Sequence, residues 1–117
     1  MTRSAPGVLI AGTGSYAPSR VVSNDEISTY VETSDEWIRT RTGIRERRFA
    51  GEGETASSMG AKAAEEALES SGVSASEIDL IIVATLSPDM FFPSTASLIQ
   101  TKLGLNKVTS FDLSAAC

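Results

Sequence analysis

Apolar and polar positions alternate along the chain in short blocks, some with strand and some with helix periodicity. The run IDLIIVAT at 78–85 is β-branched and apolar, and it is bounded by the polar segments SAS and SPD. This is the pattern of a central parallel strand covered on both faces. VTSFDL at 108–113 predicts a further strand, IRERRF at 44–49 an exposed one, and the apolar run at 8–11 a first strand ended by Gly12 and Gly14.

Helical spacing accounts for the segments between these strands. In the segment 55–72, small and apolar residues recur on one face, which predicts close approach to a sheet or a second helix. This stripe contains Ala56, Met59, Gly60, Ala63, Ala64, Ala67 and Leu68. Shorter helices are predicted after Asn24, from a Thr33–Glu36 capping box to Gly43, and from Ser94 to Gly104.

The order strand, helix, strand, helix, strand predicts an α/β fold with a mostly parallel, doubly wound sheet. Strands 79–85 and 108–113, joined by a helix, form a predicted right-handed βαβ unit. Functional groups in such sheets lie beyond the carboxyl ends of the strands. Cys117, four residues after Leu113, is predicted to lie there.

Composition narrows the class of protein. The chain has 117 residues, 41% hydrophobic and 21% charged, in the range of one small globular domain. No apolar run approaches the roughly 20 residues that span a bilayer, and a net charge of −5 argues against nonspecific nucleic-acid binding. A single cysteine excludes an intramolecular disulfide and favours a reducing, cytoplasmic setting.

The positive charges are concentrated in one place. Five of the ten Lys and Arg residues lie between 39 and 48, namely Arg39, Arg41, Arg45, Arg47 and Arg48. They predict an anion-binding patch on an acidic protein. The glycine loop GTGSYAP does not add a nicotinamide site, because Ala17 stands where the dinucleotide fingerprint needs its third glycine.

Cys117 is the candidate nucleophile. At a bend between a strand and a following helix, the helix amino end would favour its thiolate. The alternative is a buried structural cysteine that packs as a small hydrophobic residue. The chain has no histidine, so any base that assists Cys117 must come from residues outside this sequence.

Several motifs together resemble the N-terminal part of β-ketoacyl-acyl carrier protein synthase III. They are GTGSYAP, ETSDEWIRTRTGIRERR, ETASSMGAKAAEEAL, DLIIVATLSPD, FPSTASLIQTKLGL and FDLSAAC, in register over essentially the whole chain. The resemblance implies that residues 1–117 are an incomplete N-terminal half of a thiolase-like fold, ending at the presumed nucleophile. It leads us to expect that the protein continues and that the sequence is divided where Cys117 is modified or otherwise discontinuous.

The resemblance also implies an activity. Cys117 would take an acyl group from acyl-coenzyme A (acyl-CoA) as a thioester, and malonyl-acyl carrier protein would then condense with it to start fatty acid synthesis. A histidine and an asparagine from the second half would assist. The family resemblance implies no metal or permanently bound cofactor, and it favours a cytoplasmic homodimer.

Four further residues receive roles from the resemblance. Trp37 would stack on the adenine of CoA, Arg41 would meet its phosphates, and Thr33 would lie beside the same nucleotide. Phe92 would reach the acyl pocket of the partner subunit. Each has a structural alternative: Trp37 as an anchor of a short helix, the arginines as a solvated face, and Phe92 as core or interface filling.

Alternative interpretations of the arginines and of the function stay open. Arg45, Arg47 and Arg48 could receive an acidic carrier protein or pair with the chain's own carboxylates. The enzyme could belong to secondary metabolism with another second substrate, or the protein could be a non-catalytic thiolase-like subunit. A self-sufficient binding module of 117 residues is disfavoured, because a parallel sheet would keep an uncovered face and edge.

Overall fold

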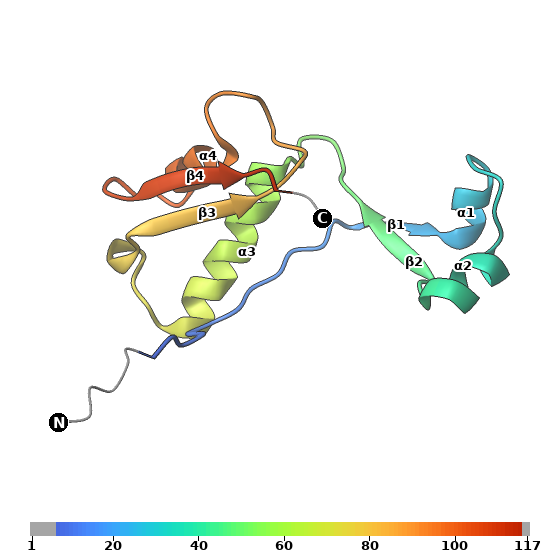
Figure 1. Ribbon diagram of the computed structural model, residues 1–117, viewed down its shortest axis with the longest axis horizontal. Coiled ribbons are helices and arrows are strands. Elements are labelled where there is room, and N and C mark those ends of the chain that lie inside the picture. The colour runs from blue at the N-terminus through green and yellow to red at the C-terminus, as the bar shows by residue number, and fades with distance from the viewer. Residues whose placement is uncertain (1–6, 116–117) are drawn as a thin grey trace. The chain divides into compact units, whose positions relative to one another are not determined.

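The computed structural model describes residues 7–115 (Figure 1). The chain divides into two compact units. The smaller unit is Ala17–Thr55, and the larger unit combines the residues up to Tyr16 with those from Ala56 onward. Each unit is described by itself.

The larger unit is built around a parallel strand pair. Its elements are α3 (Ala56–Ser71), the 3₁₀ turn η1 (Ala75–Glu77), β3 (Leu80–Ala84), α4 (Thr95–Lys102) and β4 (Thr109–Leu113). β3 and β4 are parallel, in register from Leu80 opposite Thr109 to Ala84 opposite Leu113, and α4 connects them (Figure 1). The predicted strand–helix–strand unit is therefore confirmed.

Helix α3 packs closely against α4, as the small residues of segment 55–72 predict. A Cβ atom placed on Gly60 would come within 2.7 Å of Ile99 Cδ1, and Ile99 is almost fully buried. The most buried residues of α3 are Ser57 and Ala61, which the predicted stripe did not include. Ser57 is buried by a polar contact with Asp89, which apolar periodicity cannot reveal, and Ala61 lies one turn after Ser57 on the same face of the helix.

The sheet face is only partly covered. Ile81 lies toward the helices, whereas Leu80 and Ile82 are about half exposed on the opposite face. Phe111 and Leu113 of β4 are similarly exposed. Covering on both faces, expected from the apolar run at 78–85, is thus present on one face within residues 7–115.

The predicted strand at 8–11 is wrong. This segment forms no strand, and Val8, Leu9 and Ile10 are largely exposed, because no strand among the described residues pairs with it. Residues just after it lie along α3 instead (Figure 1).

The two glycines that follow allow this close approach. A Cβ on Gly12 would lie 2.6 Å from the Ala67 carbonyl oxygen, and one on Gly14 would meet the backbone of Ala63. The prediction that these glycines end a strand is replaced by a steric role: they let the chain pass directly over the backbone of α3.

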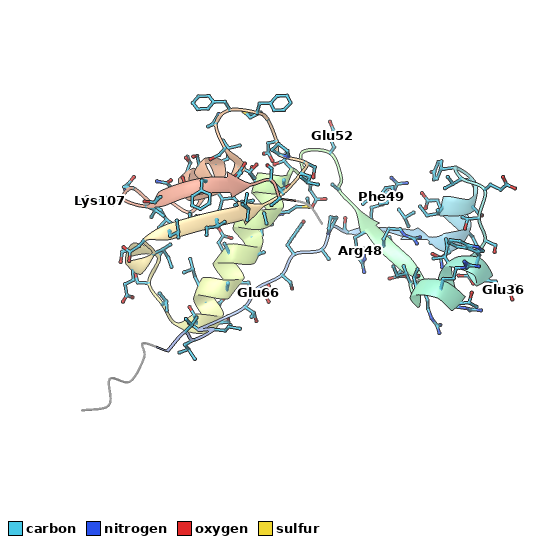
Figure 2. The ribbon with its side chains drawn as sticks, viewed as in Figure 1. Glu36, Arg48, Phe49, Glu52, Glu66 and Lys107 are labelled. Atoms are coloured by element: carbon cyan, nitrogen blue, oxygen red, sulfur yellow. The ribbon has the colours of Figure 1, made fainter. Side chains whose placement is uncertain are left out.

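The smaller unit joins two strands and two short helices. Its elements are β1 (Arg20–Ser23), α1 (Asn24–Ser28), α2 (Asp35–Thr42) and β2 (Glu46–Phe49). β1 and β2 are antiparallel, with Arg20 opposite Phe49, and Val22 is fully buried. β2 confirms the predicted exposed strand at 44–49, whereas β1 had not been predicted. Arg48 and Phe49 project to opposite sides of β2 (Figure 2).

Two predicted helix caps are displaced by one residue. Ser23, not Asn24, caps α1, and Ser34, not Thr33, caps α2 by accepting a hydrogen bond from the Trp37 N–H at 3.1 Å. Serine competes successfully because its short hydroxyl reaches the free N–H groups of the first turn. The stop at Gly43 is confirmed: its φ of 74° is left-handed, which glycine adopts readily.

Candidate functional site

Trp37 and Arg41 form a stacked pair on α2. They are one helical turn apart, and the Arg41 guanidinium carbon lies 4.5 Å from the centroid of the Trp37 ring. The Trp37 side chain is 53% exposed, so a ring face remains accessible next to a positive charge. The prediction that the two residues share one face is confirmed.

Two open depressions meet at Trp37. One is lined by Ile27, Val31, Glu32, Thr33, Ser34, Trp37 and Ile38. The other is lined by Ser34, Glu36, Trp37, Thr40 and Arg41, and Figure 2 labels Glu36 on α2. Thr33 and Arg41 thus line neighbouring depressions that share Ser34 and Trp37.

Thr33 has a hydroxyl that the fold leaves unused. Its Oγ1 atom is buried and has no hydrogen-bond partner among the described residues. A buried hydroxyl without a partner costs free energy, which a ligand donor or acceptor can offset. Because Ser34 caps α2, Thr33 is free for such a role.

Two arginines of β2 form hydrogen bonds within the smaller unit, which neither sequence interpretation, a carrier-protein surface or pairing with carboxylates, had predicted. Arg47 donates to the Val22 carbonyl at 3.2 Å and to Asn24 Oδ1 at 2.6 Å. Arg48 donates to the Pro18 carbonyl at 3.2 Å. These two guanidinium groups hold backbone and amide oxygens of the smaller unit, so they are less suited to a mobile anion than Arg41.

Two aspartates hold helix N-termini in the larger unit, and sequence reasoning missed both. Asp112 of β4 accepts hydrogen bonds from the N–H groups of Thr95 and Ala96 at 2.7 and 2.8 Å, at the start of α4. Asp89 accepts from the N–H and hydroxyl of Ser57 at 2.8 and 2.5 Å, at the start of α3. An aspartate remote in sequence gives no local capping signal.

The environment lowers the pKa of the Asp112 carboxyl from its ordinary value of 3.8. Burial is the largest single influence and raises the pKa, as does the nearby charge of Asp89. The hydrogen bonds from Ala96 and Thr95 favour the ionised form and together outweigh these effects. Asp112 is therefore a charged anchor between the sheet and α4.

The structure places only one of the two remaining predicted site residues, Cys117 and Phe92. Cys117 lies outside the described residues. Phe92 is 88% exposed, in the loop between β3 and α4 that stands clear of the sheet in Figure 1, so it does not fill the core of this chain.

Within residues 7–115, no acidic, histidine or cysteine cluster could hold a metal ion, and no helix is long and apolar enough to cross a membrane.

Comparison with known proteins identifies the class of protein to which this fold is similar. No protein-family model matches the chain. A solved structure of 3-oxoacyl-[acyl-carrier-protein] synthase III from Aquifex aeolicus superposes with a TM-score of 0.89 and 53% identity, over 95% of this chain and 36% of that one. The priming β-ketosynthase of the R1128 polyketide pathway gives a TM-score of 0.86 and 46% identity, over 92% and 32%. The chain thus has part of the thiolase fold.

Within that class, comparison of sequences identifies the family that the chain resembles. The β-ketoacyl-[acyl-carrier-protein] synthase III of Sulfurimonas denitrificans is 57% identical over 105 residues, which is 89% of this chain and 32% of that protein. The chain is therefore similar in sequence and fold to part of β-ketoacyl-[acyl-carrier-protein] synthase III, and the predicted family resemblance is confirmed. It spans about a third of the length of such relatives.

Proposed function

We propose that this chain belongs to an acyl-CoA-dependent condensing enzyme that starts fatty acid synthesis. The observation that carries the proposal is the 57% identity to β-ketoacyl-[acyl-carrier-protein] synthase III over 89% of the chain. The Trp37–Arg41 pair supports it independently, because an exposed indole face beside a guanidinium suits a base and its phosphates.

Cys117 is the proposed nucleophile. Its thiolate attacks the thioester carbonyl of acyl-CoA, a new carbon–sulfur bond forms, and CoA leaves as its thiolate. Malonyl-acyl carrier protein then loses carbon dioxide, and the resulting carbanion attacks the acyl carbonyl. The bond to Cys117 breaks, which returns the cysteine thiolate and releases a 3-ketoacyl carrier protein.

The residues of α2 are proposed to bind the donor. Trp37 stacks on the adenine, Arg41 neutralises phosphate charge, and the Thr33 hydroxyl, unpartnered among residues 7–115, takes a polar group of the nucleotide. Phe92 is proposed to contribute to the acyl pocket of a partner subunit in a homodimer; its 88% exposure supports a role outside the chain's own core. We further propose a cytoplasmic enzyme without a nucleic-acid or membrane partner.

Turnover by the full-length gene product tests this function. With acyl-CoA and malonyl-acyl carrier protein, it should form a 3-ketoacyl carrier protein and release carbon dioxide, while a Cys117→Ala variant should form no product. Product formation by the variant at the wild-type rate would contradict the role of Cys117. No product from the wild-type protein with acyl donors of several lengths would contradict the proposed reaction.

A second candidate is a condensing enzyme of secondary metabolism. The similarity to the priming β-ketosynthase of the R1128 polyketide pathway, at 46% identity, favours it. The two are distinguished by the acceptor. Faster turnover with the malonyl carrier protein of fatty acid synthesis supports the first proposal, whereas a strong preference for a polyketide carrier protein supports the second.

A further inference from the structure

A buried asparagine lies at the centre of the smaller unit. Asn24 is 1% exposed, and its side chain makes hydrogen bonds through both of its polar ends. Its Nδ2 group donates to Asp35 Oδ1 and to the Ile44 carbonyl, each at 2.8 Å. Its Oδ1 atom accepts from Arg47 at 2.6 Å. Both N–H bonds of the amide are thereby used.

These contacts hold α2 at both of its ends. Asp35 is the first residue of the helix, and Ile44 follows Gly43 just after its end. One amide group therefore bonds to the segments that enter and leave α2. Arg47 extends the network to β2 and, through the Val22 carbonyl, to β1.

Apart from this network, α2 contacts α1, and Ile38 is its one half-buried apolar residue. None of its residues is buried, so packing of an apolar face, which usually positions a helix, is weak here. Trp37 and Arg41 lie on this helix, and Trp37 is two residues after Asp35. The polar network around Asn24 is therefore the main set of hydrogen bonds that ties the helix of the stacked pair to the rest of the smaller unit.

We propose that Asn24 is the positioning residue of the nucleotide-binding helix, with Arg47 as its support and Asp35 as its contact on α2. This inference rests on the proposed function and deepens it. Asn24 does not touch the donor; it sets the angle at which Trp37 and Arg41 meet the nucleotide. Its substitution should therefore affect donors that carry the nucleotide and spare donors that lack it.

An Asn24→Asp variant of the full-length gene product tests the inference. The substitution retains the shape and the acceptor for Arg47, but it removes both N–H donors and places a carboxylate against Asp35 and the Ile44 carbonyl. The KM for acyl-CoA should rise roughly tenfold, whereas kcat should stay within about twofold. The KM for the acyl-pantetheine thioester, which lacks the nucleotide, should also stay within about twofold.

Two further variants make the result decisive. Asn106→Asp introduces the same change at an exposed position of the larger unit and should alter neither KM. Asp35→Ala removes the contact on α2, together with the ion pair between Asp35 and Arg39 at 3.6 Å, while the bonds from Asn24 to Ile44 and from Arg47 to Asn24 persist. It should raise the KM for acyl-CoA selectively, and it replaces Asn24→Asp as the deciding variant if circular dichroism shows that the latter does not fold.

The outcomes separate the inference from the proposed function. An equal rise in KM for both donors, or no rise for acyl-CoA, overturns the positioning role while the wild-type activity upholds the function. If the wild-type protein transfers no acyl group from either donor, the proposed function is wrong and the inference falls with it.

Discussion

At the scale of single residues, the Trp37–Arg41 pair is the most informative feature of the described chain. Its two members lie one turn apart, with the Arg41 guanidinium carbon 4.5 Å from the centroid of the Trp37 ring. Trp37 borders two depressions, one shared with Arg41 and the other with Thr33. An arginine stacked on an indole can be a purely structural contact. The exposure of Trp37 and the buried, unpartnered Thr33 hydroxyl among residues 7–115 favour a ligand instead.

Replacing Trp37 should therefore weaken nucleotide binding. In Trp37→Ala, loss of base stacking of about 1–3 kcal/mol should raise the KM for acyl-CoA about 5- to 160-fold. Initial-rate kinetics measure the change. Tyr30→Ala, another exposed aromatic of the smaller unit, is the matched control and should leave KM unaltered. An unchanged KM in Trp37→Ala would mean that the indole does not contact the donor.

Asp112 allows a prediction about stability and pH. Asp112→Asn should lower the free energy of unfolding at pH 7 by about 1 kcal/mol, since the amide offers a weaker cap than the carboxylate. Because folding lowers the pKa of Asp112, its stabilisation is present above the ordinary value of 3.8 and is lost as pH falls through the lower, folded pKa.

Urea unfolding across a pH series measures this difference. The gap between wild type and Asp112→Asn should narrow as the pH is lowered below 3.8. Asp79→Asn, an exposed aspartate of the same unit, serves as the control and should follow the wild type. A gap that widens toward acid pH would contradict the direction of the pKa shift.

Among the helices and strands, tertiary contacts explain which elements could be predicted from the sequence and which could not. β3, α4 and β4 were predictable because their periodicity and capping signals are local. The segment 8–11 has a strand's composition, yet strand formation needs a neighbour that composition does not supply. The roles of Asn24 and Asp112 depend on partners 10 or more residues away, so reading Asn24 as a local cap was reasonable and wrong.

The close approach of the N-terminal segment to α3 gives a prediction at this scale. In Gly14→Ala, the new methyl group would meet the backbone of Ala63 and Ala67, and the resulting overpacking should cost about 1–3 kcal/mol of unfolding free energy. In Gly60→Ala, the methyl meets only the flexible end of Ile99, and the gain in helix propensity of about 1 kcal/mol should offset the contact.

Thermal unfolding of the two variants, each made in the full-length gene product, compares these costs. Gly7→Ala is the control, since a Cβ there would have no neighbour within 4 Å. Gly14→Ala should have a lower Tm than either of the other variants. Equal Tm values for Gly14→Ala and Gly7→Ala would show that residues 12–15 do not rest on α3.

At the scale of the whole molecule, the chain carries apolar surface on several elements of the larger unit. Ile82 and Leu113 are about half exposed on the sheet, Ile10 is 81% exposed, and Phe91 is fully exposed. The motifs shared with a longer enzyme explain why the sequence alone predicted the family, whereas the role of Cys117 stays a prediction. The side-chain network around α2 could be found only once the fold had brought its members together.

The 117-residue chain expressed by itself should accordingly bind a hydrophobic dye and aggregate, because exposed apolar patches promote association. Dye fluorescence and light scattering during heating measure this, with the full-length gene product as the reference. A soluble monomer with one sharp unfolding transition would contradict the expectation.

The proposed function depends above all on Cys117 as the residue that accepts the acyl group. Mass spectrometry of the full-length gene product after incubation with an acyl-CoA tests this role. We expect an acyl adduct on the peptide containing FDLSAAC, which neutral hydroxylamine removes because it cleaves thioesters and which a Cys117→Ala variant lacks. A free, unacylated Cys117 thiol in the wild-type protein would contradict the account.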